Sequence, residues 1–283
     1  MRLTPYYYLA PALVALCAIN IFPIFYCLYI SFTNQVMYRP EIAFVGPANY
    51  LELLNNASVK TSFRVTLVFT FLTITLSFFL GMVLALLLSR EIRGQRLFRV
   101  LFTLPLVVPP VVVGICWKFM YNSEVGVIGA YFLPRILQIP IRTLLGSPST
   151  SIYAVALADV WNQTPLVFLI LLAGIESIPS DYYEAARIDG ASSWQIFRHI
   201  TIRQLEAPIL LVLLFRFIGA INTFDTIFAM TEGGPGDSTM TLVIIGEKMA
   251  FYYFRMGLAS AFAVLIVIFT FSVVFFAVIK YLR

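Results

Sequence analysis

The sequence predicts an all-α integral membrane protein with six transmembrane helices, and two observations support this fold class. First, 60% of the 283 residues are hydrophobic and only 12% are charged, whereas about a quarter of a typical soluble domain is charged. Second, the chain contains apolar runs long enough to cross a bilayer as helices. Little sequence remains for a soluble domain, so we predict a single transmembrane domain over residues 1–283. The predicted spans are roughly residues 6–32, 62–88, 100–120, 151–175, 209–230 and 258–281.

The first three runs differ in how continuous they are. The first begins close to Met1 and is longer than the apolar part of a secretory signal, so we expect a retained helix. The second has no strong polar interruption. The third contains Pro105, Pro109 and Pro110, and each proline removes a backbone N–H from the helix. We therefore expect the third span to be bent or broken, as in helices that line transporter cavities.

Polar side chains interrupt the fourth and fifth runs, where they are costly in a bilayer and indicate function. Asp159 shares one helix face with Asn162 or Gln163, which follow it by three and four residues. Arg216 lies about 12 Å along the fifth helix from Pro208, well inside the membrane, at about 1.5 Å per residue. Two interpretations are open. Arg216 and Asp159 form a structural pair, or these groups line a translocation pathway.

A polar pathway would suit a sugar. Sugar hydroxyls need amide, carboxylate and guanidinium partners. An aromatic side chain such as Trp161 or Phe224 would pack against the face of the sugar ring.

The distribution of Lys and Arg predicts the orientation. Segments outside the spans fall into two alternating sets, and the set with both chain ends and the 89–99 and 179–208 loops is the more basic. The more basic set faces the cytoplasm in most membrane proteins. We therefore expect both termini and the 179–208 loop to be cytoplasmic.

The 179–208 loop has the pattern of two short helices with a glycine between them. Ser180 or Asp181 can cap the first helix, with Glu184 as the returning carboxylate. Gly190 stands where a helix end favours positive φ. Ser192 and Gln195 form a second predicted capping box. By itself, this pattern is equally typical of an amphipathic hairpin that only fills the space between two spans.

The residues of this loop favour a more specific interpretation. Glu184-Ala185-Ala186, then Asp189-Gly190, then Phe197, Ile200 and Thr201 resemble the EAA loop of permease subunits of binding-protein-dependent ABC importers. The resemblance implies that Glu184, Ala185, Ala186, Asp189 and Gly190 couple the permease to a cytoplasmic ATPase. Ile202-Arg203 stands where the family usually has Leu-Pro, so we expect a less kinked exit from the second helix.

Other segments resemble the carbohydrate-uptake branch of this family, which includes maltose and glycerol-phosphate importers. They include Phe44-Val45-Gly46 with Asn49-Tyr50, and Phe224-Asp225 followed by Thr231 and Gly233-Gly234-Pro235. In maltose-type permeases the spans before and after the coupling loop hold the substrate. By position, the resemblance implies a substrate pathway formed by Asp159, Asn162, Gln163, Leu166, Arg216, Gly219, Ala220 and Thr223.

The resemblance also implies the partners and the membrane. We expect a multi-pass protein of a prokaryotic inner membrane. Its partners would be a homologous second permease, two ATPase subunits, an extracytoplasmic solute-binding protein and a sugar, with no nucleic acid. Uptake of glycerol phosphate or another polar solute is the alternative within the family. A self-contained secondary transporter or channel is the alternative from another class.

The sequence contains no recognisable catalytic constellation. His199 is the only histidine, which excludes histidine metal clusters and an ordinary Ser-His-Asp triad. No phosphate-binding GxxxxGK[ST] motif is present. We expect no enzyme activity, no metal and no cofactor in this chain, with ATP and Mg²⁺ bound by partner ATPase subunits. Cys17, Cys27 and Cys116 lie in apolar runs without metal-ligand spacing.

Overall fold

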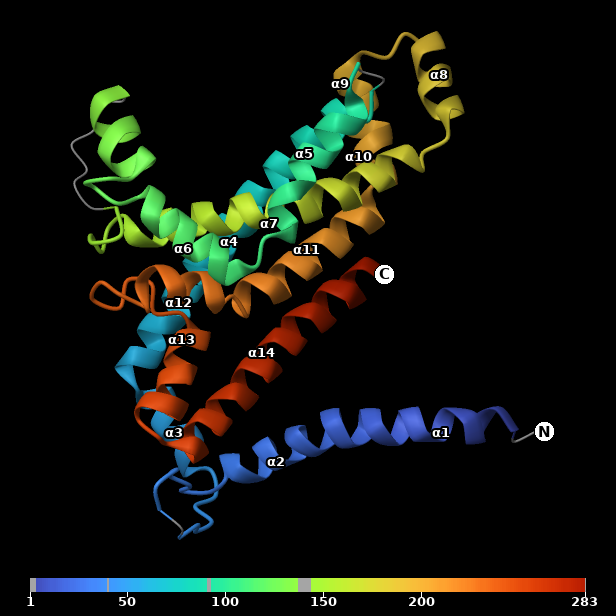
Figure 1. Ribbon diagram of the computed structural model, residues 1–283. Coiled ribbons are helices and arrows are strands. Elements are labelled where there is room, and N and C mark those ends of the chain that lie inside the picture. Colours follow the sequence, from blue (N-terminus) through green and yellow to red (C-terminus); the bar gives the residue numbers. More distant parts are fainter. Residues whose placement is uncertain (1–3, 40, 91–92, 137–143, 283) are drawn as a thin grey trace. The chain divides into compact units, whose positions relative to one another are not determined.

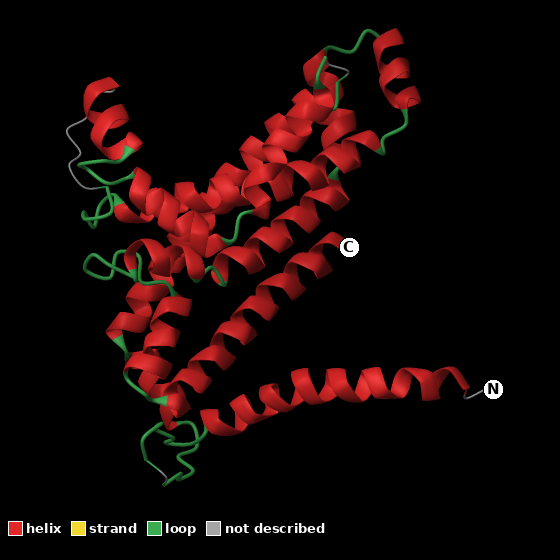
Figure 2. Cartoon of the chain, in the orientation of Figure 1, coloured by secondary structure: helices red, strands yellow, loops and turns green. Residues whose placement is uncertain are grey.

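The computed structural model describes residues 4–39, 41–90, 93–136 and 144–282, which are mostly helical and contain no extended strand (Figures 1 and 2). The described chain forms two compact units, residues 1–61 with 245–283 and residues 62–244. The helices are α1 (Thr4–Leu16), α2 (Phe22–Ser31), α3 (Ala48–Asn55), α4 (Ala57–Leu88), α5 (Gln95–Val107), α6 (Pro110–Met120), α7 (Ser151–Glu176), α8 (Ser180–Ile188), α9 (Ser193–Ile196), α10 (Ile202–Gln204), α11 (Glu206–Ile221), α12 (Asp225–Thr231), α13 (Leu242–Glu247) and α14 (Met256–Leu282). Single π-helical segments cover Cys17–Ile21, Val127–Ile136, Phe197–Thr201 and Lys248–Tyr252.

The first unit packs α2 and α3 against α14. The buried Asn49 amide donates hydrogen bonds of 2.8 Å to the carbonyls of Ser31 and Thr33, and so satisfies groups left open where α2 ends. Gly257 lies so close to this turn that an added Cβ would be 2.0 Å from the Thr33 carbonyl oxygen. Asn49 and Gly257 therefore fix the turn that follows the first span.

The second unit is built on α4 and α7. Met82, Ala85 and Leu88 of α4 bury against a core that includes Phe168 and Leu171 of α7. Gly81 permits this approach, because an added Cβ there would be 2.5 Å from a methyl group of Val167 in the facing helix. The α7 helix also packs against α5, α6, α11 and α12. It is the central helix of this unit and carries the first half of the candidate site.

The predicted membrane spans are confirmed as four to six. Tyr8–Ser31, Ala57–Leu88, Ser151–Glu176 and Met256–Tyr281 are each long and apolar enough to cross a bilayer. Two bent helix pairs bring the number to six if each pair is one span. The third span is broken as expected, since α5 and α6 meet at 97° around Val108 and Pro109.

The fifth predicted run, 209–230, is not one helix. The α11 helix ends at Ile221, and α12 begins separately at Asp225. The side chains of Asn222 and Thr223 donate to the carbonyls of Ile218 and Gly219, at 2.8 and 3.0 Å. Polar side chains that bond to nearby carbonyls compete with continuation of a helix.

The prediction of a weak bend at the exit from the 179–208 loop was wrong. We expected a weaker kink because Ile202-Arg203 replaces Leu-Pro, but the helices on either side of Leu205 meet at 67°. Pro208 accounts for the bend, because a proline ring clashes with the carbonyl four residues earlier. Leu205 is fully buried at the bend, and Gly174 of α7 leaves room for Leu205 and Pro208.

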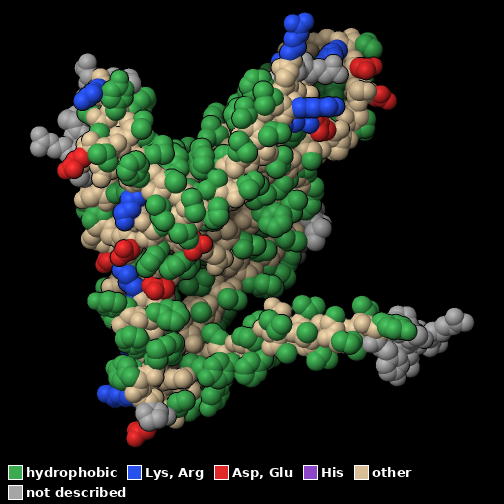
Figure 3. Space-filling model, viewed as in Figure 1, with side chains coloured by type: hydrophobic (Ala, Val, Ile, Leu, Met, Phe, Trp, Pro, Cys, Tyr) green, Lys and Arg blue, Asp and Glu red, His purple; other side chains and the backbone are tan. Residues whose placement is uncertain are grey.

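One group of charged side chains lies at the end of the second unit that carries α8 and α9 (Figure 3). Figure 3 shows acidic and basic groups around α8 and α9, while the sides of the helices are mainly hydrophobic. At this end Arg99 pairs with Glu176, and its guanidinium donates to the Leu88 carbonyl at 2.9 Å. Arg99 and the 179–208 hairpin thus lie at the same end of the unit (Figure 1). That this end faces the cytoplasm remains a prediction.

Candidate functional site

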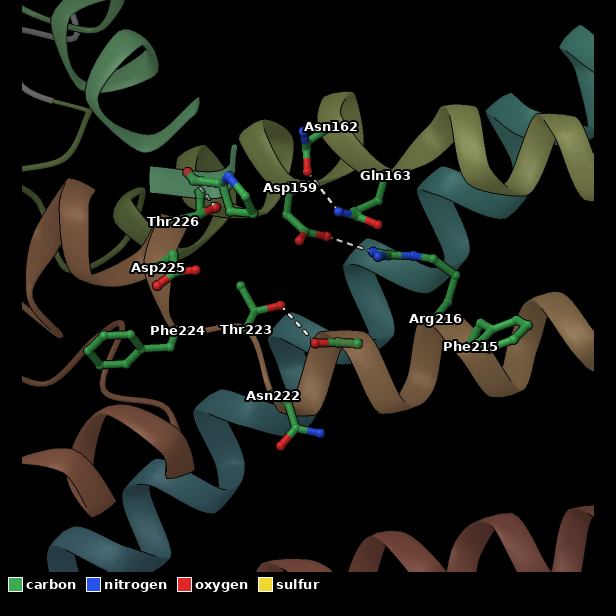
Figure 4. A pocket seen from close by; sticks show the side chains of 12 residues that line it. Asp159, Asn162, Gln163, Phe215, Arg216, Asn222, Thr223, Phe224, Asp225 and Thr226 are labelled. Atoms are coloured by element: carbon green, nitrogen blue, oxygen red, sulfur yellow. Dashed lines mark hydrogen bonds and ion pairs between the residues drawn. The ribbon is translucent and has the colours of Figure 1, made fainter. Parts of the chain in front are cut away.

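A buried ion pair joins three helices of the second unit. Arg216 of α11 donates from Nη2 to Oδ2 of Asp159 on α7 at 2.6 Å, and from Nε to the Ser77 hydroxyl of α4 at 3.1 Å. Ser77 in turn donates to the Thr73 carbonyl. The Arg216 and Asp159 side chains are only 2% and 6% exposed. Figure 4 shows the guanidinium extending from α11 towards α7.

Asn162 donates hydrogen bonds to backbone carbonyls at the break in the third span. Its Nδ2 donates to the Pro105 carbonyl at 2.7 Å and to the Val108 carbonyl at 3.2 Å. In an uninterrupted helix the Pro105 carbonyl would accept from residue 109, but residue 109 is a proline without an N–H. The Asn162 amide therefore takes the place of the missing backbone donor. Its oxygen accepts from the Gln163 amide at 2.7 Å.

A polar pocket of about 200 Å³ opens beside the ion pair. Its walls include six of the eight residues predicted for the substrate pathway; Leu166 and Ala220 do not line it, and Ala220 is 1% exposed. The pocket is lined by Pro110, Asp159, Asn162, Gln163, Phe215, Arg216, Gly219, Asn222, Thr223, Phe224, Asp225 and Thr226.

The residues at the break between α11 and α12 form a wall of the pocket, and most of them were not among the eight residues predicted for the substrate pathway. Phe224 and Asp225 lie at this break (Figure 4), and the Phe224 ring stacks on Phe228 at 5.0 Å between centroids. The polar string Asn222 to Asp225 was visible in the sequence. The sequence did not show that these residues line one pocket, because a continuous helix would turn their side chains to different faces. Trp161, the other aromatic candidate, packs against Trp117 and does not line this pocket.

Both interpretations of Arg216 and Asp159 remain compatible with this geometry. The pair is buried and joins helices, as a structural pair does, and it also forms part of the pocket wall. Among the residues that the structure describes, no group of three or more His, Cys, Asp or Glu side chains is placed to hold a metal ion.

The 179–208 hairpin has the predicted two-helix form. Gly190 follows α8 with φ +75°, and an added Cβ would meet no atom within 4 Å. The Ser192 and Gln195 capping box is present in both directions. The five predicted coupling residues lie together here, all exposed except the half-buried Ala186.

The predicted cap of the first hairpin helix was wrong. Pro179 occupies the N-cap with ψ 137°, and no side chain caps the helix. Ser180 and Asp181 are already inside α8 and face each other, with 3.5 Å between Ser180 Oγ and Asp181 Oδ1. Glu184 is therefore free of a capping role and exposed.

Comparisons with known proteins identify the family of this chain. The family described as "Binding-protein-dependent transport system inner membrane component" matches residues 77–283. The trehalose/maltose transport system permease protein MalF of Thermococcus litoralis is 34% identical over 98% of this chain and 94% of its own length. The trehalose transport system permease protein SugA of Mycobacterium tuberculosis is 33% identical over 91% of this chain and 81% of its own.

Solved structures show the same fold. A chain of a bacterial ABC transporter involved in import of the acidic polysaccharide alginate superposes with a TM-score of 0.85 over 99% of this chain and 95% of its own, at 19% identity. The same kind of transporter with an alginate pentasaccharide-bound periplasmic protein gives 0.83 over 97% and 92%, at 18% identity. The match over residues 77–283, together with these relatives, means that this chain is a multi-pass membrane protein of the family of binding-protein-dependent transport system inner membrane components.

Proposed function

We propose that this chain is the permease subunit of an ATP-driven sugar importer and forms half of its translocation pathway. The observation that carries the proposal is the pocket between α7 and α11. It combines amide, hydroxyl, carboxylate and guanidinium groups with the ring of Phe224, which are the partners that sugar hydroxyls and ring faces need. The names of the relatives, which are trehalose and maltose permeases, support the same substrate class.

The partners follow from the same comparison. The permease would assemble with a homologous second permease, two ATPase subunits and an extracytoplasmic solute-binding protein. ATP and Mg²⁺ would bind to the ATPase subunits and not to this chain. The alginate transporter whose fold this chain shares is described with a substrate-bound periplasmic protein, which supports a similar assembly.

The hairpin would dock on an ATPase subunit from the cytoplasmic side. Ile188 is 87% exposed and Trp194 is 65% exposed at its tip. Large apolar side chains that stand out from an otherwise charged surface are typical of protein contacts. A hairpin that only filled space between spans would bury such side chains.

The test is sugar-stimulated ATP hydrolysis by the reconstituted importer, with Gly190→Val as the variant. Valine at φ +75° costs about 1–2 kcal/mol locally. We expect normal amounts of this chain in the membrane, less ATPase copurifying with it, and hydrolysis that no longer follows transport. Gly236→Val is the matched control, because Gly236 has φ +55° and no atom within 4 Å of an added Cβ, but lies outside the hairpin.

Two results would contradict the proposal. Normal stimulation and uptake in Gly190→Val would mean that the hairpin does not couple to the ATPase. Sugar uptake by this chain alone in liposomes would instead identify a self-contained transporter or channel.

A further inference from the structure

The ends of three helices meet at the base of the 179–208 hairpin. The α4 helix ends at Leu88, α5 begins at Gln95, and α7 ends at Glu176. The last carbonyls of a helix lack a donor within that helix, and the side chains of Gln95 and Arg99 donate to the Leu88 carbonyl at 2.6 and 2.9 Å. Arg99 also pairs with Glu176. One side chain of α5 therefore holds the ends of α4 and α7.

Both contacts of Arg99 use the same nitrogen. Its Nη2 donates to the Leu88 carbonyl and to the Glu176 carboxylate. The Nε of this guanidinium is buried and has no hydrogen-bond partner among the described residues. A displacement of Glu176 therefore acts directly on the nitrogen that attaches α5 to the end of α4.

This ion pair is poorly placed to stabilise the fold. The Arg99 and Glu176 side chains are 31% and 46% exposed, and ion pairs that water can reach contribute little to stability. If Arg99 is replaced, the Leu88 carbonyl keeps the bond from Gln95. Substitutions of the pair should therefore leave the folded protein in the membrane, so that an effect on transport can be separated from an effect on folding.

Glu176 is joined to the hairpin by a short, hydrogen-bonded connection. The backbone N–H groups of Ser177 and Ile178 still donate to carbonyls of α7, at 3.1 and 3.2 Å. The first hairpin helix, α8, then begins at Ser180. Little slack remains between the two helices, so a movement of α8 is passed on to Glu176.

The other end of α5 reaches the pocket. Val108, where α5 ends, lies about 14 Å from Arg99, at about 1.5 Å per residue. The Val108 carbonyl accepts from the Asn162 amide at 3.2 Å. Asn162 lines the pocket, and so does Pro110 at the start of α6. The α5 helix thus runs from the base of the hairpin to the pocket wall.

We propose that the Arg99–Glu176 pair is a positioning contact that couples the hairpin to the pocket through α5. The inference rests on the proposed function and adds a connection that the five predicted coupling residues do not include, beside the α11 limb. Coupling between distant sites is carried by packed helices and hydrogen bonds with more than one arrangement. With the pair intact, α5 follows the hairpin end of α7 and shifts the wall at Asn162 and Pro110. Without it, α7 moves and α5 stays behind.

The test measures how the pocket responds to ATP and requires no knowledge of the solute. A thiol is introduced by Thr223→Cys, since Thr223 lines the pocket, in a chain whose Cys17, Cys27 and Cys116 are replaced by Ala. The importer, assembled with its ATPase subunits in membrane vesicles, is labelled with methyl methanethiosulfonate in the presence and absence of Mg-ATP. The ratio of the two labelling rates reports how strongly the state of the ATPase changes the pocket.

We expect this ratio to differ from one by several-fold in the parent and to return most of the way to one in Arg99→Gln and in Glu176→Gln. The amount of this chain and of copurifying ATPase should stay at the parent level. Arg99→Glu should lose the response as well, because two carboxylates then repel each other. Adding Glu176→Arg to Arg99→Glu should restore part of it. A merely structural role would lower abundance and would not respond to charge reversal.

Glu52→Gln is the matched control, because Glu52 and Arg255 form a pair of similar exposure in the first unit, 43% and 45%. This variant should keep the parent ratio. A parent ratio of one, a parent-like ratio in Arg99→Gln and Glu176→Gln, or no recovery on charge reversal would overturn the inference. Failure of the proposed function is distinguishable, because it would appear as an ATPase that sugar does not stimulate even in the parent, or as sugar uptake by this chain alone.

Discussion

Two arginine–carboxylate pairs place the same chemical groups in opposite surroundings. Arg216 and Asp159 are 2% and 6% exposed between helices of the second unit, whereas Arg255 and Glu52 are 45% and 43% exposed in the first. Both pairs have short hydrogen bonds, 2.6 Å in the buried pair and 2.7 Å for Arg255 Nη2 with Glu52 Oε2. Geometry alone would rank them as equal. Burial decides otherwise, because a charge that loses its partner in the interior has no water to replace it.

Breaking the buried pair should give the largest effect. Asp159→Asn leaves a buried guanidinium without its counter-charge, and removal of one partner of a buried pair costs about 3–5 kcal/mol. We expect a large loss of folded protein in the membrane for Asp159→Asn and for Arg216→Met.

The double variant Asp159→Leu with Arg216→Met separates structure from transport. It removes both charges, so abundance should recover towards the wild-type level. Abundance is measured beside sugar uptake per molecule. Recovered abundance with lost uptake would assign the pair to the pathway, and normal uptake would assign it to structure alone. Full abundance in both single variants would show that the pair contributes nothing to folding.

Replacing the buried Asn162 amide should come second. Asn162→Leu removes the side-chain donor from the carbonyls of Pro105 and Val108, and the Pro105 carbonyl keeps only the longer bond from the Val108 N–H at 3.2 Å, so we expect a cost of about 1–3 kcal/mol for the group left unsatisfied. Resistance to unfolding in mixed micelles should fall accordingly. Asn20→Leu is the control, because the Asn20 amide also donates to a carbonyl, that of Leu16, but is exposed. An equal loss of resistance to unfolding in both variants would mean that Asn162 does not specifically stabilise the broken third span.

Removing the Ser77 hydroxyl should have a smaller effect. Ser77→Ala takes one acceptor from Arg216 but leaves the Asp159 bond in place, so about 1–2 kcal/mol is expected. Ser272 serves as the control, because its hydroxyl also bonds to the carbonyl four residues earlier but lies exposed on α14. The micelle unfolding midpoint should move in Ser77→Ala and stay constant in Ser272→Ala.

The exposed pair should give the smallest effect. The hydrogen bond from Arg255 lowers the pKa of Glu52. A lowered folded-state pKa means a contribution that is complete above the ordinary carboxyl value of about 4.3 and is lost as pH falls through the folded value. Because both side chains are well exposed, we expect less than about 1 kcal/mol. Glu52→Gln should remove this pH dependence below pH 5, while stability at neutral pH changes little.

Patterns along the chain predicted the helices and the broken third span, because apolar length and proline position act locally. They also offered a pair of Arg216 with Asp159 as one of two interpretations, since a lone arginine in the membrane is costly, and the structure contains that pair. They did not predict that Asn162 serves the Pro109 break, because the carbonyls that it meets lie 57 and 54 residues earlier in the chain. The partner of an amide depends on which helices pack together.

The two incorrect local predictions share one cause, which is a proline acting on neighbouring residues. Pro179 occupies the cap position that Ser180 or Asp181 was expected to take. Pro208 bends the chain at Leu205, before the position of the proline itself. The bend is present even though Ile202-Arg203 stands where the family usually has Leu-Pro. In both places the fixed φ and missing N–H of proline outweighed the preference of the adjacent side chains.

The bend at Leu205 determines how motion can pass from the hairpin to the pocket. Leu205 is closely packed against α7 beside Gly174, and this packing would let the limbs before and after it turn together as one bent rod. Arg216 lies about 16 Å beyond the bend, at about 1.5 Å per residue. With the limbs inclined at 67°, rotating the hairpin limb by about 10° about its own axis carries Arg216 sideways by roughly 2–3 Å, which exceeds the distance range over which a hydrogen bond survives. With such a bend, a small rotation at the membrane surface would be enough to rearrange the pocket wall.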